Sequence, residues 1–247
     1  MQSLSTLELA YCAVVLVVSY ALRGSTGFGG FVAMPLMALV LPMKLLVPVW
    51  TLLTIASSIT IVGKERRHVG VIDIARMAPG CLLGIGIGLA FFKSLDSEML
   101  ARGFGALVIG YGVYSLWAAT RAPSRWHGAP RTVATVAGTL GGIVGTVFGN
   151  MASLAFAVYF DALKINKERF RATMSAMMLM LSLVRGVGYY AVGEFEWQAV
   201  IVFALSLPPM LLGIFIGDRV HANISDLAFK RMVCAVLIAS GVPLMIK

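Results

Sequence analysis

The sequence is poor in charge, and poorest in acidic residues. Only 13% of its 247 residues are charged, and 11 of these are Asp or Glu against 20 Lys or Arg. Every acidic residue falls in a loop or at the end of an apolar run, and none stands in the middle of one. Proton and cation pumps usually need a carboxylate within the membrane. The distribution therefore argues against that class of transporter.

Cysteine and histidine are scarce too, with three of each. Cys12, Cys81 and Cys234 lie in apolar segments at spacings that fit no metal motif, which favours buried packing. The histidines fall in loops, and no base is placed to activate a Ser or Cys within an apolar run. We therefore expect no metal site, no cofactor and no catalytic residues, and the chain is not predicted to be an enzyme.

Apolar residues, by contrast, make up 59% of the chain. Several charge-free runs reach the roughly 18–20 residues that cross a bilayer, and no polar gap is long enough for a soluble domain. The runs are 24–43, 45–63, 77–92, 103–120, 132–160, 172–184, 197–217 and 232–246. This pattern predicts an all-α, multi-pass membrane protein with a single transmembrane domain, residues 1–247. Residues 1–10 lack the Lys or Arg of a cleavable signal peptide.

The chain contains an internal repeat. Pro79 and the Leu-Leu-Gly-Ile run after it match Pro208 and its following run at an offset of 129, and Phe28-Gly29-Gly30 matches Phe148-Gly149-Asn150 at an offset of 120. A loop-length difference accounts for the change in offset. The repeats cover about 7–119 and about 132–246.

The positions of Lys and Arg predict how the repeats are oriented, because cytoplasmic loops are enriched in these residues. If 7–42 and 132–160 are single crossings, the positive charges divide almost evenly between the two sides. If each enters and returns as a hairpin broken at its glycines, one side holds 14 and the other 4. The positive side then comprises loops 63–76, 119–131, 161–171 and 218–231. The predicted fold is two inverted repeats, each a Gly-broken helical hairpin plus three transmembrane helices, with both termini outside. The net charge of +9 then reflects these loops and not nucleic-acid binding.

A glycine-rich break opens each repeat. Residues 24–30 hold four glycines after Arg23, and residues 145–150 contain a shorter copy. Irregular backbone is tolerated at membrane depth only where it lines a cavity or is buried in protein. Inverted repeats with matching breaks predict a secondary transporter whose substrate site lies near the midplane. Each restarting helix would offer unpaired N–H groups to an anion, with Asn150 as an N-cap.

Arg185 lies roughly 12 Å from the nearer end of its predicted span, at about 1.5 Å per residue. A charge at that depth usually marks a substrate path; an ion pair with Glu8 or Glu194 is the alternative. Close helix packing is the alternative for the glycines, and bonding back to the helix is the alternative for hydroxyls such as Thr54, Ser57, Ser58 and Ser175. The predicted substrate-binding residues are Arg23, Ser25, Thr26, Gly27, Gly29, Gly30, Thr51, Thr146, Gly149, Asn150, Ser153, Thr173 and Arg185.

The run Gly27-Phe28-Gly29-Gly30 followed by Pro35-Leu36, with a weaker copy mid-chain, resembles the sulfite exporter TauE/SafE family of bacterial membrane permeases. The resemblance spans essentially the whole chain. In the second copy Asn150 stands where a glycine is expected and Ala155 replaces the proline. The resemblance implies transport of sulfite or short organosulfonates across the bacterial cytoplasmic (inner) membrane.

The predicted function is therefore alternating-access transport of a small anion, with the lipid bilayer as the surrounding partner and no nucleic acid bound. A small-anion channel and a non-transporting membrane subunit are the alternatives. The sequence leaves open the identity of the anion, the direction of transport, any coupling ion and whether the protein is a homodimer.

Overall fold

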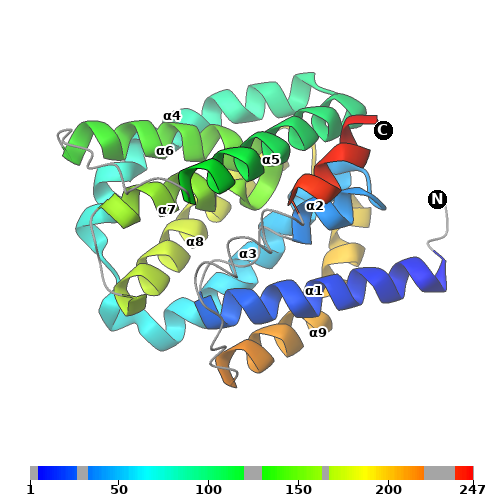
Figure 1. Cartoon of the computed structure of the whole chain (residues 1–247), viewed down its shortest axis with the longest axis horizontal. Coiled ribbons are helices and arrows are strands. Elements are labelled where there is room, and N and C mark those ends of the chain that lie inside the picture. The colour runs from blue at the N-terminus through cyan, green and yellow to red at the C-terminus, as the bar shows by residue number, and fades with distance from the viewer. Residues whose placement is uncertain (1–4, 27–32, 120–129, 163–166, 220–236, 247) are drawn as a thin grey trace.

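The computed structural model describes residues 5–26, 33–119, 130–162, 167–219 and 237–246, and these residues form helices with no β-strand among them (Figure 1). The all-α prediction is therefore confirmed. The helices are α1 (Thr6–Thr26), α2 (Ala33–Ala38), α3 (Met43–Glu65), η2 (Arg66–His68), α4 (Val71–Ser94), α5 (Ser97–Ala119), α6 (Pro130–Phe148), η3 (Gly149–Met151), α7 (Ala152–Ala162), α8 (Lys167–Ala191), α9 (Trp197–Arg219) and a last helix at Leu237–Ile246.

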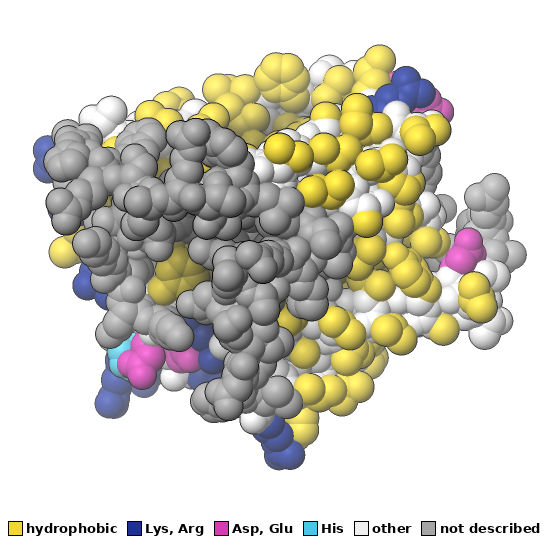
Figure 2. Space-filling model, viewed as in Figure 1, with side chains coloured by type: hydrophobic (Ala, Val, Ile, Leu, Met, Phe, Trp, Pro, Cys, Tyr) yellow, Lys and Arg dark blue, Asp and Glu magenta, His cyan; other side chains and the backbone are white. Residues whose placement is uncertain are grey.

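Among the described residues, six helices are long and apolar enough to cross a bilayer, namely α1, α3, α4, α6, α8 and α9. Large apolar side chains point outward from them: Val187 is 71% exposed and Leu205 66%. Hydrophobic side chains cover much of the described surface in view, while charged side chains gather near its margins (Figure 2). Soluble proteins rarely expose so much contiguous apolar surface. The chain is a multi-pass membrane protein.

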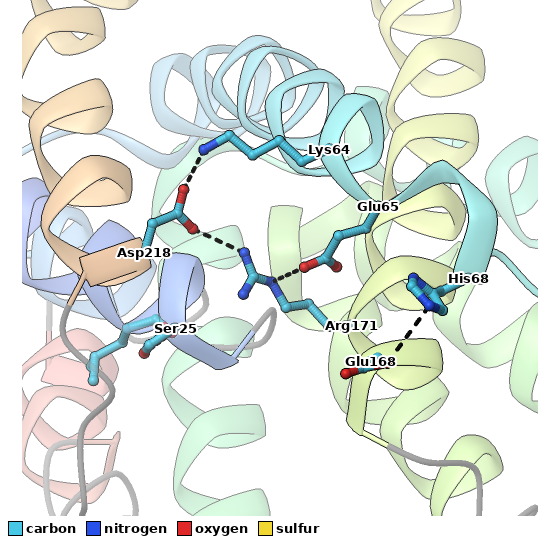
Figure 3. Close-up of polar contacts among 8 residues, drawn as sticks. Ser25, Lys64, Glu65, His68, Glu168, Arg171 and Asp218 are labelled. Carbon is cyan, nitrogen blue, oxygen red and sulfur yellow. Dashed lines mark hydrogen bonds and ion pairs between the residues drawn. The ribbon is translucent and has the colours of Figure 1, made fainter.

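Ion pairs join three helices at one end of the molecule, which we call the charged end (residues 64–73, 168–173 and 218–219). Arg171 of α8 contacts Glu65 of α3 at 3.3 Å and Asp218 of α9 at 2.9 Å, and Lys64 of α3 donates to the same Asp218 carboxylate (Figure 3). Beside this network His68 lies 3.6 Å from the Glu168 carboxylate. These contacts bring together the described parts of loops 63–76, 161–171 and 218–231, as the hairpin interpretation predicts.

The second hairpin is defined by its contacts with α4. Positions 80, 84 and 88 of α4 approach positions 135–139, 139–143 and 143–146 of α6 in turn, so the two helices run in the same direction and both begin at the charged end. Helix α8 also begins there, because the Gly70 amide donates to Thr173 at 2.9 Å. The chain therefore enters through α6, turns at η3 and returns through α7 to the end from which it came.

The first hairpin differs from the second in its proportions. Helix α1 alone has 21 residues, enough to cross the membrane, whereas α2 has only six. The Tyr11 hydroxyl donates to the Leu36 carbonyl at 3.2 Å, which ties the beginning of α1 to the end of α2. Residues 41–44 and 192–198 form this end of the molecule, which we call the opposite end. Both α1 and α3 begin at it (Figure 1).

Glycines let the helices of the two outer interfaces touch backbone to backbone. A Cβ at Gly84 of α4 would meet the Thr139 carbonyl oxygen of α6 and lie 2.9 Å from the Gly142 Cα. A Cβ at Gly213 of α9 would lie 2.9 Å from the Tyr20 Cβ of α1. Small residues serve this purpose in many membrane proteins. The packing alternative therefore describes the glycines of α4 and α9.

Candidate functional site

The centre of the site is a buried line of hydroxyl side chains along α3. Thr51, Thr54, Ser57 and Ser58 are all 0% exposed. The first three donate to carbonyls one turn earlier in α3, at 3.0, 2.7 and 3.2 Å, the back-bonding expected of such residues in membrane helices. Their oxygen lone pairs are still able to accept hydrogen bonds from neighbouring helices.

Arg23, in the last turn of α1, reaches this line. Its side chain is 2% exposed, and its Nη2 donates to the Ser58 hydroxyl at 2.8 Å. Its Nε is buried and has no hydrogen-bond partner among the described residues. A cation at the carboxyl end of a helix is favoured by the helix dipole, and the buried Nε remains able to donate to another acceptor.

Arg185 lies on α8, a second helix that packs against α3. It is 1% exposed and donates to the Gly145 carbonyl, to the Gly149 carbonyl at 2.8 Å and to the Ser182 hydroxyl at 3.2 Å. Its Nε is also buried without a described partner. The sequence predicted that an anion would meet a helix start at this break. In the structure the arginine instead contacts the carbonyl end of α6, where orphan acceptors and the negative end of the dipole lie.

Neither guanidinium forms an ion pair with any described acidic residue. Glu194, the suggested partner of Arg185, is paired with Lys44 at 3.0 Å, and the Glu8 carboxylate accepts hydrogen bonds from Ser5. The two arginines are instead close enough to interact electrostatically with each other. Burying one unpaired charge costs on the order of several kcal/mol, even after the protein relaxes. Repulsion between two like charges adds to that cost.

The break in the second hairpin brings the two halves of the chain together. Gly149 has φ +70°, a left-handed conformation that glycine adopts without strain. A Cβ there would lie 2.8 Å from the Met34 Cε of α2 and 3.9 Å from the Trp50 Cβ of α3. The chain after Gly149 continues as the 3-10 turn η3, so α7 restarts at Ala152 and not directly at Asn150.

Other predicted residues fall at different depths. Thr146 is buried on α6, with a hydroxyl that has no described partner and a carbonyl that accepts from Tyr189. Thr51 lies beside Gly186, next to Arg185 in the sequence. Ser153 is buried in the first turn of α7. These positions belong to the same central region as the arginines.

Two predicted residues lie elsewhere. Thr173 is at the charged end, where it holds the Gly70 amide, twelve residues from Arg185 and therefore about 18 Å away along α8. Ser25 bonds back to the Leu22 carbonyl at 3.1 Å and lies towards Asp218 at the same end (Figure 3). Residues Gly27, Gly29 and Gly30 lie outside the described residues, as do the side chains of Thr26 and Asn150.

Sequence reasoning missed several side chains of this region. Ser182 and Tyr189 stand three residues before and four after Arg185, so helical spacing could have placed them on its face. Trp50 is 0% exposed and its indole Nε1 has no described partner; no pattern in the sequence marked it. No cluster of His, Cys, Asp or Glu able to hold a metal occurs in the described part of the chain.

The region holds two buried cations and surplus hydrogen-bond donors, and neither cation is paired with a described carboxylate. Residues 11–244 match the family model described as "Sulfite exporter TauE/SafE". The chain has no significant match to a curated protein or to a solved structure. The match covers nearly the whole sequence, including both glycine-rich breaks and both buried arginines, and the chain therefore belongs to the sulfite exporter TauE/SafE family of membrane transporters.

Proposed function

We propose that this protein is a secondary transporter of a small oxyanion, sulfite or a short organosulfonate, that works by alternating access in the bacterial cytoplasmic membrane and catalyses no chemical reaction. The observation that carries the proposal is the pair Arg23 and Arg185, both almost fully buried and without an acidic partner among the described residues. A bound anion would neutralise the pair. The site residues proposed to contact it are these arginines with Thr51, Thr146 and Gly149.

The unsatisfied polar atoms of the region support an oxyanion in particular. The Nε atoms of Arg23 and Arg185 and the Nε1 of Trp50 are buried without described partners, and all three can only donate. Buried donors without acceptors cost about 1–3 kcal/mol each. A ligand with several negatively charged oxygens would satisfy these groups together, whereas a cation or an apolar molecule would satisfy none.

Helix contacts support the proposed inverted repeats. The repeat relates α1 to α6 and α4 to α9, and the most extensive outer interfaces are α1 with α9 and α6 with α4. Each interface is thus the counterpart of the other. Gly84 and Gly213, which match at the offset of 129, make the close approaches in them. A pseudo-two-fold axis through the centre would exchange the two pairs, as in transporters built from inverted repeats.

Alternating access needs a closure at each end, and both ends offer one. The ion pairs of Arg171 and Lys64 tie α3, α8 and α9 together at the charged end. At the opposite end Lys44 pairs with Glu194 and lies 5.0 Å above the Phe92 ring, beside a pocket of about 160 Å³. We propose that the present arrangement is an occluded one, because Arg23 and Arg185 are only 2% and 1% exposed.

The direction favoured by the membrane potential is outward. An inside-negative potential drives an anion out of the cell by about 2.3 kcal/mol per charge per 100 mV. Export would therefore proceed without a coupling ion, whereas uptake would require one.

The proposal is tested by sulfite flux in liposomes reconstituted with wild-type protein and with Arg185→Leu. Removing one partner of a buried charge contact usually costs 2–5 kcal/mol or more, so we expect transport to fall by about 30-fold or more. The matched control is Arg102→Leu, because Arg102 is 58% exposed and its one ion pair within the described part of the chain is with Glu98 of the same helix.

The flux must also saturate as sulfite is raised if the protein is a carrier. Flux that stays proportional to concentration, with large single-channel currents, would identify a channel instead. Undiminished transport by a correctly inserted Arg185→Leu protein would remove Arg185 from the site, and absence of sulfite, sulfonate and carboxylate flux in the wild type would indicate a non-transporting subunit.

A further inference from the structure

Trp50 is the largest fully buried side chain among the described residues. Its indole Nε1 is enclosed without a hydrogen-bond partner among the described residues. Buried tryptophans usually find an acceptor for this N–H. Packing alone does not account for the residue, since a phenylalanine or leucine would fill apolar space without leaving a donor unsatisfied.

Trp50 packs against a residue close to each arginine. Its ring stacks on Tyr20, with centroids 5.9 Å apart and planes at 29°, and Tyr20 stands three residues before Arg23 on α1, so the two share a helix face. The Trp50 Cβ would lie 3.9 Å from a Cβ built on Gly149, whose carbonyl accepts from Arg185. Trp50 thus lies between a helix face that carries Arg23 and a backbone turn that binds Arg185.

We infer that Trp50 is a specificity-determining residue that donates its indole N–H to the transported anion, an inference that rests on the proposed function. The three groups come from three helices, Arg23 from α1, Trp50 from α3 and Arg185 from α8. Three donors arriving from separate directions suit a head group with three oxygens arranged around a central atom. A sulfonate or sulfite has that shape, while a planar carboxylate has two oxygens and would leave one donor unmatched.

A ligand-binding role and a packing role for Trp50 predict different effects of its replacement. Removing the N–H should weaken binding of a three-oxygen anion, because a hydrogen bond to a charged group is lost. In the unliganded protein the same change removes an orphan donor but leaves part of the indole's volume unfilled, so each variant's binding is measured relative to its own unliganded stability. A residue with only a packing role would change the unliganded stability without changing the preference between the two anions.

The experiment compares Trp50→Phe with Trp50→His at pH 8. Histidine keeps less of the volume of tryptophan than phenylalanine does, but only the neutral imidazole keeps a ring N–H. Thermal stability of the purified protein is measured without ligand and against a series of methanesulfonate and acetate concentrations, since the stabilisation by a bound ligand gives its affinity. The two anions share a methyl group and differ in their oxygens.

We expect Trp50→Phe to bind methanesulfonate about ten- to a hundredfold more weakly than wild type and to bind acetate almost unchanged, each judged against the unliganded melting temperature of that variant. Trp50→His should recover part of the preference for methanesulfonate. The inference is overturned if Trp50→Phe binds both anions as wild type does, or if both variants lose both anions equally.

Failure of the underlying function would look different. Wild-type protein would then be stabilised by neither anion, and Arg185→Leu would behave as the wild type does in every ligand series.

Discussion

Arg171 ties α8 to α3 and α9 at the charged end, and under the proposed alternating access its removal should favour opening of that end. The perturbation is Arg171→Gln, which keeps most of the side-chain length and removes the charge. Arg171 is 20% exposed, as is its partner Asp218, and Glu65 is 24% exposed. These pairs are therefore partly screened by solvent and contribute less than fully buried ones.

The magnitude follows from the two contacts. A partly exposed ion pair with good geometry contributes up to about 1 kcal/mol, so the loss of both corresponds to about 1–2 kcal/mol. If opening of the charged end breaks them, Arg171→Gln should raise the population open at that end by about 5- to 30-fold, at RT of about 0.6 kcal/mol. The pair between Lys64 and Asp218 remains in the variant and limits the effect.

The assay is the rate at which a membrane-impermeant thiol reagent labels Thr54→Cys from the charged-end side, in a background in which Cys12, Cys81 and Cys234 are replaced by serine. Thr54 is fully buried midway along α3, so labelling requires opening. The control is Arg102→Gln, which breaks an ion pair within α5 alone. Equal labelling rates in Arg171→Gln and wild type would refute the reasoning, as would an equal increase in the control.

Two further predictions concern packing and the extent of the site. Gly84→Val should lower the melting temperature by several degrees because its side chain would meet the α6 backbone, whereas Gly86→Val, which faces open space, should leave it within about a degree; equal effects would contradict the close packing. Thr173→Val should cost about 1 kcal/mol of stability through the loss of its bond with Gly70, measured by thermal unfolding, while the KM for sulfite stays at the wild-type value; a raised KM at wild-type stability would return Thr173 to the substrate site.

The sequence predicted which charged side chain is buried where depth in the membrane was informative. Arg185 stands far from any loop in the sequence, and the structure buries it in the helix bundle. Prediction was weaker where it relied on the matched positions of the repeat. Thr51 and Thr173 occupy equivalent places, yet Thr51 lies beside Gly186 at the level of Arg185 and Thr173 lies at the charged end. Antiparallel packing of α3 and α8 separates them, because equivalent positions on antiparallel helices move towards opposite ends.

For the hairpins too, the sequence indicated some features and not others. Counting Lys and Arg placed loops 63–76 and 161–171 on one side, and the contact between Glu65 and Arg171 agrees. The lengths of the arms were not evident: the sequence did not indicate that α1 would run for 21 residues before the first break. Glycines weaken a helix locally, but the partner that α1 packs against, α9, helps to decide how far it continues.

The sequence by itself determined the solvent of this protein and the secondary structure that the solvent permits. Long apolar runs must lie in lipid, and a chain in lipid must satisfy its backbone hydrogen bonds within helices. Only the tertiary structure decided that Arg23 bonds to Ser58 of α3 and that Trp50 of the same helix lies beside Gly149, whose carbonyl accepts from Arg185. These residues come from segments far apart in the chain, and their contacts depend on how the helices cross, which is set by side-chain packing between segments and not by any local pattern of residues.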